Sequence, residues 1–87
     1  METYTVYILY SKTFDKYYIG QSSDVRKRIT LHNECRVKST APYVPWEIHW
    51  YCTKNSRSEA IILERKLKNL NRTRIEAFIV KYPTEKH

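Results

Sequence analysis

The sequence predicts a small α+β domain in which a three-stranded antiparallel sheet is flanked by helices, in the order strand, strand, helix, strand, helix, helix. Two patterns support this prediction. Aromatic and β-branched residues gather in short runs, which is typical of strands, and apolar residues elsewhere recur every three or four positions, which is typical of helices. Because 87 residues leave room for one core, residues 1–87 are expected to form a single domain.

The N-terminal segment is expected to form a hairpin. Residues 3–10, TYTVYILY, are mostly aromatic or β-branched and are predicted to be the first strand. The polar run SKTFDK at residues 11–16 indicates a turn, after which YYIG at residues 17–20 resumes a short strand. The two runs lie near enough in sequence to pair through a connection longer than a two-residue turn.

A helix is predicted after Gly20. Ser22 or Ser23 is expected to cap it, with Asp24 in the first turn, where the helix dipole favours negative charge. The predicted helix is expected to end at Asn33. The residues between these limits that recur at helical spacing are Val25, Ile29 and His32.

The middle of the chain is predicted to be a loop followed by the third strand. Residues 34–46 contain two prolines and indicate the loop, and WEIHWYC at residues 46–52 alternates in part, as a strand does. Cys35 and Cys52 lie in these segments without the spacing of a metal site. We expect them to be reduced thiols that pack as small apolar side chains.

Two helices are predicted at the C-terminal end. SRSE matches a capping box in which Ser56 pairs with Glu59. One apolar stripe follows it: Ala60, Leu63, Leu67 and Leu70. A shorter helix is expected from about Thr73 to Pro83. Its inward-facing residues are expected to be Ile75, Phe78, Ile79 and Tyr82.

The charge of the chain favours a polyanionic partner. Sixteen Lys and Arg residues against nine Asp and Glu residues give a net charge of +7, and each neutralised phosphate releases counterions. An acidic protein and a membrane surface are the alternative partners that charge alone leaves open. The apolar runs are too short to span a bilayer and no signal-peptide pattern opens the chain, so a cytoplasmic protein is expected.

Five residues together offer the groups that phosphodiester cleavage needs: Tyr7, Tyr18, Arg28, His32 and Glu64. The two tyrosines fall on neighbouring predicted strands, and the arginine and histidine are four residues apart on one helical face. A carboxylate can hold a divalent metal, a guanidinium matches phosphate geometry, and a phenol can act as a base if nearby cations lower its pKa. Each residue alone also has a structural interpretation, such as a sheet aromatic or an ion pair between Glu64 and Lys68.

These residues belong to motifs that resemble those of the GIY-YIG nuclease family. YIG stands at residues 18–20, and VYIL at residues 6–9 is a common form of the first motif. SSDVRKRITLHN at residues 22–33 resembles the family helix in which an arginine precedes a histidine by four positions. SRSEAIILERKLK at residues 56–68 resembles the helix that supplies the metal-binding glutamate. The similarity, which covers residues 4–80, is greatest to small stand-alone bacterial members and extends to the N-terminal nuclease domain of the excision-repair nuclease.

The resemblance implies a metal-dependent endonuclease that hydrolyses DNA phosphodiester bonds in DNA repair or recombination, with Mg²⁺ or Mn²⁺ as cofactor. It implies that Tyr7 is the general base or its relay, and that Tyr18 holds Tyr7 or a water. Arg28 would contact the scissile phosphate, and His32 would assist proton movement. Glu64 would bind the metal.

Gly20, the only glycine of the chain, has two interpretations. Structurally, it would let the strand turn sharply into the helix, because glycine tolerates positive φ. Functionally, its missing side chain would let another backbone or a phosphate approach closely. With the resemblance, we expect it to make the turn and to leave room for the phosphate.

The basic segment at residues 65–74, RKLKNLNRTR, could follow a nucleic-acid backbone, although a solvated helical surface is the alternative. The expected nucleic-acid contacts are Arg26, Lys27, Lys66, Lys68, Arg72 and Arg74.

The sequence departs from the family pattern in three places. Thr5 and Val6 stand where the first motif has glycine and isoleucine, and Gln21 stands where some members carry lysine. Asn69 and Asn71 are the candidates for an asparagine that positions the site in some relatives.

Two other functions stay open: a nucleic-acid-binding module of the same fold with little or no turnover, and an interaction domain for an acidic protein. RNA is an alternative substrate to DNA, and a protein partner is an alternative source of specificity.

Overall fold

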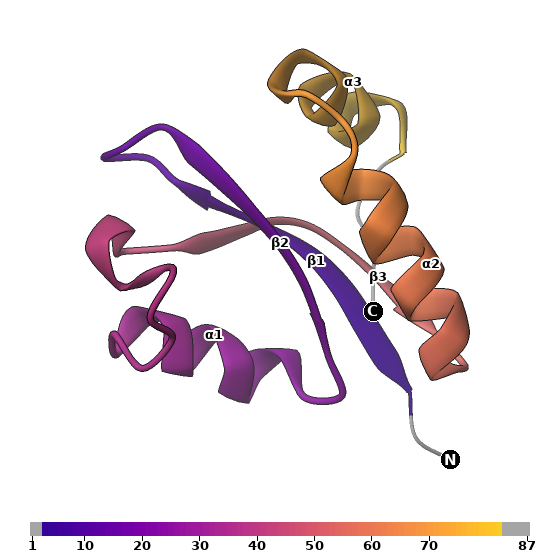
Figure 1. The fold of residues 1–87 in the computed structure, drawn as a ribbon, viewed down its shortest axis with the longest axis horizontal. Coiled ribbons are helices and arrows are strands. Elements are labelled where there is room, and N and C mark those ends of the chain that lie inside the picture. Colours follow the sequence, from indigo (N-terminus) through magenta and orange to yellow (C-terminus); the bar gives the residue numbers. More distant parts are fainter. Residues whose placement is uncertain (1–2, 83–87) are drawn as a thin grey trace.

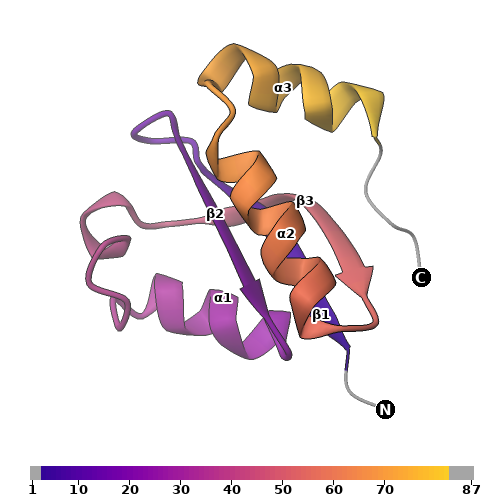
Figure 2. The ribbon, with the colours of Figure 1, turned by 45° about the vertical axis from the view of Figure 1, so that its right-hand side comes forward.

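The computed structural model describes residues 3–82 and confirms the predicted α+β class and order of elements. In chain order, the elements are β1 (Tyr4–Ser11), β2 (Lys16–Ser22), α1 (Val25–Asn33), the short 3₁₀ helix η1 (Ala41–Tyr43), β3 (Glu47–Lys54), α2 (Arg57–Lys68) and α3 (Arg72–Lys81). Helix η1 is an addition within the predicted loop. Figures 1 and 2 show α1 on one side of the sheet and α2 on the other, with α3 continuing beyond α2.

Strand β1 is the centre of the sheet, which has the order β2-β1-β3 with both pairs antiparallel. In the register of β1 and β2, Tyr7 lies opposite Gly20 and Leu9 lies opposite Tyr18. Successive side chains of a strand point to opposite faces, so Tyr7, Leu9 and Tyr18 share one face. The prediction that a hairpin brings Tyr7 and Tyr18 onto neighbouring strands is confirmed.

Each face of the sheet has its own apolar core, which explains why β1 is apolar along most of its length. On the side of α2 and α3, the buried residues are Val6, Ile8, Ile19, Trp50, Ala60, Leu67 and Ile75. On the side of α1, the buried residues are Tyr7, Leu9 and Trp46, with Val25 and Ile29 of the helix packed against them. The side chain of Tyr7 therefore lies inside the protein, in the layer between the sheet and α1.

The cap of α1 differs from the prediction. Asp24, and neither Ser22 nor Ser23, is the N-cap: its backbone is extended (φ −141°, ψ 90°) and its carboxylate accepts the N–H of Lys27 at 3.1 Å. Ser22 instead accepts the N–H of Asp24 at 3.0 Å, so it orders the turn that precedes the helix.

The caps of α2 and α3 set where these helices begin. Ser56 accepts the N–H of Glu59 at 3.2 Å, which confirms it as the predicted N-cap of α2. Asn71 caps α3 by accepting the N–H of Arg74 at 2.9 Å, so this helix begins one residue before the predicted start. The side-chain oxygen of Asn71, a candidate for the asparagine that positions the site in some relatives, is thus used in capping α3.

Tyr82 and Cys35 are exposed, contrary to the prediction that they pack inward. Tyr82 is 48% exposed because α3 ends at Lys81, and its backbone oxygen accepts the indole N–H of Trp50 at 2.6 Å. Cys52 packs against the core as expected, and Pro83 lies outside the described residues.

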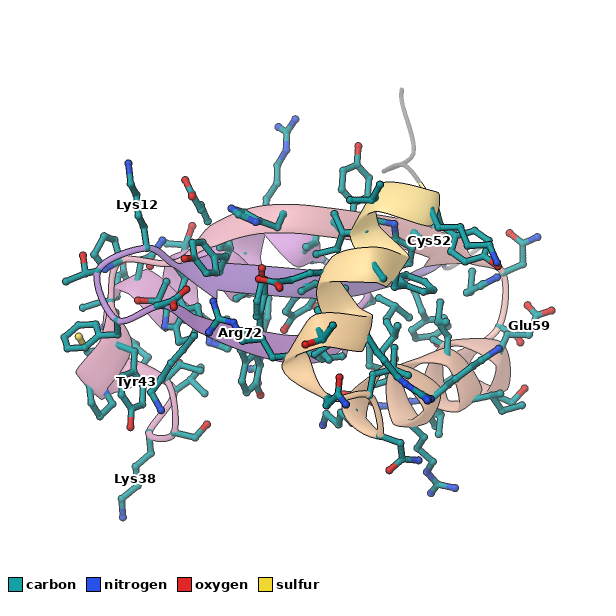
Figure 3. The ribbon with its side chains drawn as sticks, turned by 90° about the horizontal axis from the view of Figure 1, so that it is seen from above. Lys12, Lys38, Tyr43, Cys52, Glu59 and Arg72 are labelled. Carbon is teal, nitrogen blue, oxygen red and sulfur yellow. The ribbon has the colours of Figure 1, made fainter. Side chains whose placement is uncertain are left out.

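Helix α3 is tied to the tip of the hairpin by Arg72 (Figure 3). The guanidinium donates to the backbone oxygen of Asp15 at 2.7 Å and pairs with its carboxylate. It also lies 5.5 Å from the ring of Tyr17, whose hydroxyl donates to Glu76 of α3 at 3.2 Å. These contacts join segments that are far apart in the sequence.

Candidate active site

The phenol of Tyr7 occupies the space above Gly20. Tyr7 is 2% exposed, and a Cβ atom at position 20 would lie 2.6 Å from its Oη and 2.8 Å from its Cζ. Gly20 does not have a positive φ, and β2 continues to Ser22, so the predicted turn at Gly20 is wrong. A close approach does occur there, but the group that approaches is the ring of Tyr7. Glycine is needed at this position because any side chain would displace that ring.

His32, in the last turn of α1, meets the two tyrosines. Its ring is fully buried, and its Nε2 lies 3.3 Å from the Tyr7 Oη. The ring of Tyr18 packs against it in an edge-to-face arrangement, with centroids 5.1 Å apart. Three of the five candidate catalytic residues therefore come from three different elements to one buried point.

Thr40, a residue that sequence reasoning missed, fixes the protonation of His32. Its Oγ1 lies 2.7 Å from Nδ1 of His32 and donates its single hydrogen to the backbone oxygen of Val37 at 3.2 Å. With that hydrogen on the Val37 oxygen, the hydroxyl accepts from the histidine, and on this hydrogen-bond pattern we assign the ring proton to Nδ1. Nε2 carries the lone pair, so the Tyr7 hydroxyl donates to it.

Trp46 and Asn33 hold the loop that carries Thr40. The amide of Asn33 accepts the backbone N–H of Trp46 at 2.7 Å and donates to its carbonyl at 3.1 Å. The indole N–H of Trp46 donates to the backbone oxygen of Thr40 at 2.9 Å. Thr40 lies in a predicted loop, where no periodicity applies, and the sequence gives no signal that its side chain returns to His32.

Arg28 and Glu64 reach the same region from α1 and α2. Arg28 is half-buried, one helical turn before His32, and both it and Glu64 lie near enough to influence the ionisation of Tyr7. The side chain of Glu64 is 18% exposed and pairs with Lys68 at 3.2 Å. The ion pair with Lys68, which was the structural interpretation of Glu64, is thus formed, and Glu64 also lies near Tyr7 as the functional interpretation requires.

The six expected nucleic-acid contacts are all exposed, but their charges are not equally available. Arg72 is held by Asp15 and Glu76, and Lys68 is held by Glu64. The other four, which take part in no ion pair among residues 3–82, are Arg26, Lys27, Lys66 and Arg74.

Comparison with known proteins identifies the family. The family model described as the GIY-YIG catalytic domain matches residues 3–77. The chain belongs to the GIY-YIG family. It is similar to the UPF0213 protein BH0048 from Bacillus halodurans, solved by NMR, with 29% identity, a TM-score of 0.60, and coverage of 91% of this chain and 84% of that one. The comparison with curated proteins found no match.

Membership of the GIY-YIG family makes this a nuclease domain with nucleic acid as its substrate class. The predicted family and the predicted general class of enzyme, a nuclease, are confirmed. Within residues 3–82, no helix is both long and apolar enough to cross a membrane.

Burial decides the ionisation of Tyr7 in the GIY-YIG site. Burial raises the pKa of its phenol, the neighbouring Arg28 lowers it, and the charges of Tyr18 and Glu64 raise it further. The net pKa is raised, so the condition under which the phenol itself would be a base, a pKa lowered by nearby cations, is not met here. The pKa of His32 is lowered, first by burial and then by the charge of Arg28. Both groups are therefore neutral at neutral pH, with the proton on Tyr7.

A hydrated magnesium ion suits the donors that this GIY-YIG site offers. Among residues 3–82 there is no group of three or more His, Cys, Asp or Glu side chains that could enclose a metal. Glu64 is a carboxylate near enough to Tyr7 to raise the pKa of its phenol. Magnesium keeps several waters and commonly binds through one or two carboxylates together with substrate phosphate, so Glu64 with waters and a phosphate fits it.

The clearance over Gly20 predicts a coupling between positions 20 and 7. Gly20→Ala should destabilise the domain by about 1–3 kcal/mol, because the methyl group overpacks the space filled by the phenol. In a Tyr7→Leu background the same change should cost much less, since the ring is gone. Urea unfolding of the four proteins gives the coupling energy. An equal cost in both backgrounds would instead indicate a requirement of the backbone at position 20.

The low pKa of His32 predicts that the domain loses stability in mild acid. Protonation is disfavoured in the folded state, so the unfolded chain binds more protons once the pH falls below about 6.5. The free energy of unfolding should therefore fall from pH 7 to pH 5, and this fall should shrink in His32→Gln. His49→Gln is the control, because His49 lies partly exposed against Glu47 and away from Tyr7. If His49→Gln alone removed the pH dependence, the assignment to His32 would be wrong.

Proposed function

We propose that this GIY-YIG domain is a metal-dependent endonuclease that hydrolyses DNA phosphodiester bonds in DNA repair or recombination. The observation that carries the proposal is the buried hydrogen bond from the Tyr7 hydroxyl to Nε2 of His32, whose other nitrogen is held by Thr40. The resemblance to the excision-repair nuclease domain supports the repair or recombination role.

The hydrogen-bond chain supplies a route for the proton of the attacking water. The Tyr7 oxygen donates its hydrogen to Nε2 of His32 and keeps lone pairs that can accept a hydrogen from water. As the water attacks phosphorus, Tyr7 takes that proton and passes its own to His32. The imidazolium so formed still donates from Nδ1 to Thr40 and now donates from Nε2 to Tyr7. Tyr7 thus acts as a relay, which explains how a phenol with a raised pKa can serve as the base.

Arg28 and Tyr18 complete the protein's part of the reaction. The guanidinium of Arg28 matches two phosphate oxygens and offsets the charge that develops on them. Tyr18, whose ring packs on His32, would orient the water through its hydroxyl. Glu64 would hold Mg²⁺ or Mn²⁺, which when bound supplies Lewis-acid stabilisation of the leaving oxygen.

Nicking of supercoiled plasmid DNA in Mg²⁺ or Mn²⁺ tests the proposal. Tyr7→Phe and Glu64→Ala should each lower the rate by at least about 100-fold, because one removes the proton relay and the other the metal ligand. Tyr43→Phe is the matched control, a half-buried tyrosine of the same core whose loss of hydroxyl should leave the rate unchanged. Cleavage that survives in both site variants would contradict the assigned site.

A second prediction concerns Thr40, which positions His32. Thr40→Val should lower the nicking rate by about 10-fold or more, while Thr40→Ser should keep it, because only valine lacks the oxygen that accepts from Nδ1. Nitrogen-15 NMR of the His32 ring should show a proton on Nδ1 in the wild type and in Thr40→Ser, and a mixture of tautomers in Thr40→Val. A slow valine variant with an unchanged tautomer would overturn the positioning role.

One observation favours the alternative of a nucleic-acid-binding module without turnover. Lys68 pairs with Glu64 at 3.2 Å and so competes for the carboxylate that the metal needs. DNA binding without metal, unaffected by Glu64→Ala and without nicking, would identify this function in place of the nuclease.

A further inference from the structure

The face of the sheet opposite Tyr7 carries a hollow that the candidate active site does not use. It has a volume of about 600 Å³ and lies between the end of β3, α2 and α3. That volume is within the range of ligand pockets, about 300–1,000 Å³. We propose that this hollow binds an unpaired nucleotide of a single-stranded DNA segment; the choice of DNA rests on the proposed function.

The floor of the hollow is apolar and aromatic. Trp50 of β3 is buried there, and Phe78 packs edge-on against it with ring centroids 4.9 Å apart. Leu63 of α2 closes the floor from the other side. Tyr82, at 48% exposure, lies at the mouth with its ring centroid 4.9 Å from that of Phe78, and the Lys81 ammonium lies 5.4 Å from the same ring. A nucleobase can stack on such a ring whatever its identity.

The rim is cationic, and this follows from the spacing of residues on each element. On α3, Arg74 and Lys81 stand one turn before and one turn after Phe78, the aromatic floor residue of that helix. On α2, Lys66 follows the floor residue Leu63 by three positions, and on β3, Lys54 follows Trp50 on the same strand face.

Within residues 3–82, the charges on the rim have no acidic counterpart. In this part of the chain no acidic side chain lines the hollow, and the four cations form no ion pair. Arg72 and Lys68, on the same two helices, are by contrast each held by carboxylates. Four like charges gathered around an aromatic floor repel one another until an anion binds. A nucleotide supplies both the anionic phosphate and the flat apolar base that this surface fits.

The hollow and the candidate active site lie on opposite faces of the sheet, and helix α2 contributes a residue to each of them. Leu63 lines the hollow, and the next residue, Glu64, belongs to the candidate active site. The width of a helix with its side chains is about 10–12 Å, a distance that a few nucleotides of one strand span. A strand whose phosphate lies at Arg28 and Glu64 could therefore place a nearby nucleotide in the hollow. The hollow would then favour DNA that has an unpaired segment beside the cleavage point.

The test is binding of fluorescein-labelled oligodeoxythymidine of about 12 nucleotides, measured by anisotropy in EDTA so that no cleavage occurs. The reference probe is an abasic oligonucleotide of equal length and charge. The wild type should bind oligodeoxythymidine about 10-fold more tightly than the abasic strand, and Tyr82→Ala should reduce this preference, because it removes a stacking ring.

The double variant Lys66→Gln/Arg74→Gln should weaken binding of oligodeoxythymidine about 10-fold and lower its salt slope by about 1.4, as expected for two lost phosphate contacts. Lys12→Gln/Lys38→Gln is the control that removes equal charge. Figure 3 shows both control lysines at the end of the molecule away from Cys52, a residue of the hollow. The control should weaken binding less than about 3-fold.

Three results would overturn the proposal: equal loss in both double variants, equal wild-type affinity for the two probes, or competition by polyglutamate as strong as that by oligodeoxythymidine. The last would indicate an acidic protein as the occupant. The outcome is separate from that of the nicking assay. Nicking that depends on Tyr7, without any preference for oligodeoxythymidine, would support the nuclease function and reject nucleotide binding in the hollow. A preference for oligodeoxythymidine in a protein that does not nick would support binding in the hollow and reject the nuclease function.

Discussion

The contact between the Tyr7 ring and the backbone of Gly20 is the constraint on which the rest of the site depends. The ring can lie over β2 because position 20 has no side chain, and in this position its hydroxyl meets His32 from α1. His32 in turn needs Thr40 to hold its other nitrogen, and Thr40 needs the loop that Trp46 and Asn33 fix in place. The chain of hydrogen bonds from Tyr7 through His32 to Thr40 thus depends on the absence of a Cβ atom at position 20.

The sequence predicted the parts of the fold that depend on periodic patterns. The pairing of Tyr7 and Tyr18 follows from two aromatic runs in a hairpin, and the placement of Arg28 and His32 follows from a four-residue spacing. Thr40 could not be predicted, because a loop has no period and its return to His32 depends on tertiary packing. The turn predicted at Gly20 was wrong for a related reason. A single glycine looks the same in the sequence whether it allows a sharp turn or makes room for the side chain of a neighbouring strand.

The sheet separates two kinds of surface. On the side of α1, burial keeps Tyr7 and His32 neutral and holds the proton chain away from bulk water. On the side of α2 and α3, exposed cations surround aromatic rings, and the charge stays open to solvent. Glu64 on α2 stands between them, so one helix connects the chemistry that we propose to the binding that we infer.

The ties between α3 and the hairpin tip have a consequence for the order of folding. Arg72 and Asp15 are 57 residues apart in the sequence, and Tyr17 and Glu76 are 59 residues apart. Contacts of such separation form only after the entropy of closing a long loop has been overcome. Helix α3 should therefore dock late, on a sheet that already exists. A chain whose hairpin has not formed would lack the contacts that hold α3 to the hairpin tip. It would also lack the hollow between β3, α2 and α3, because α3 forms one side of it. Nucleotide binding in the hollow would therefore report that folding is complete.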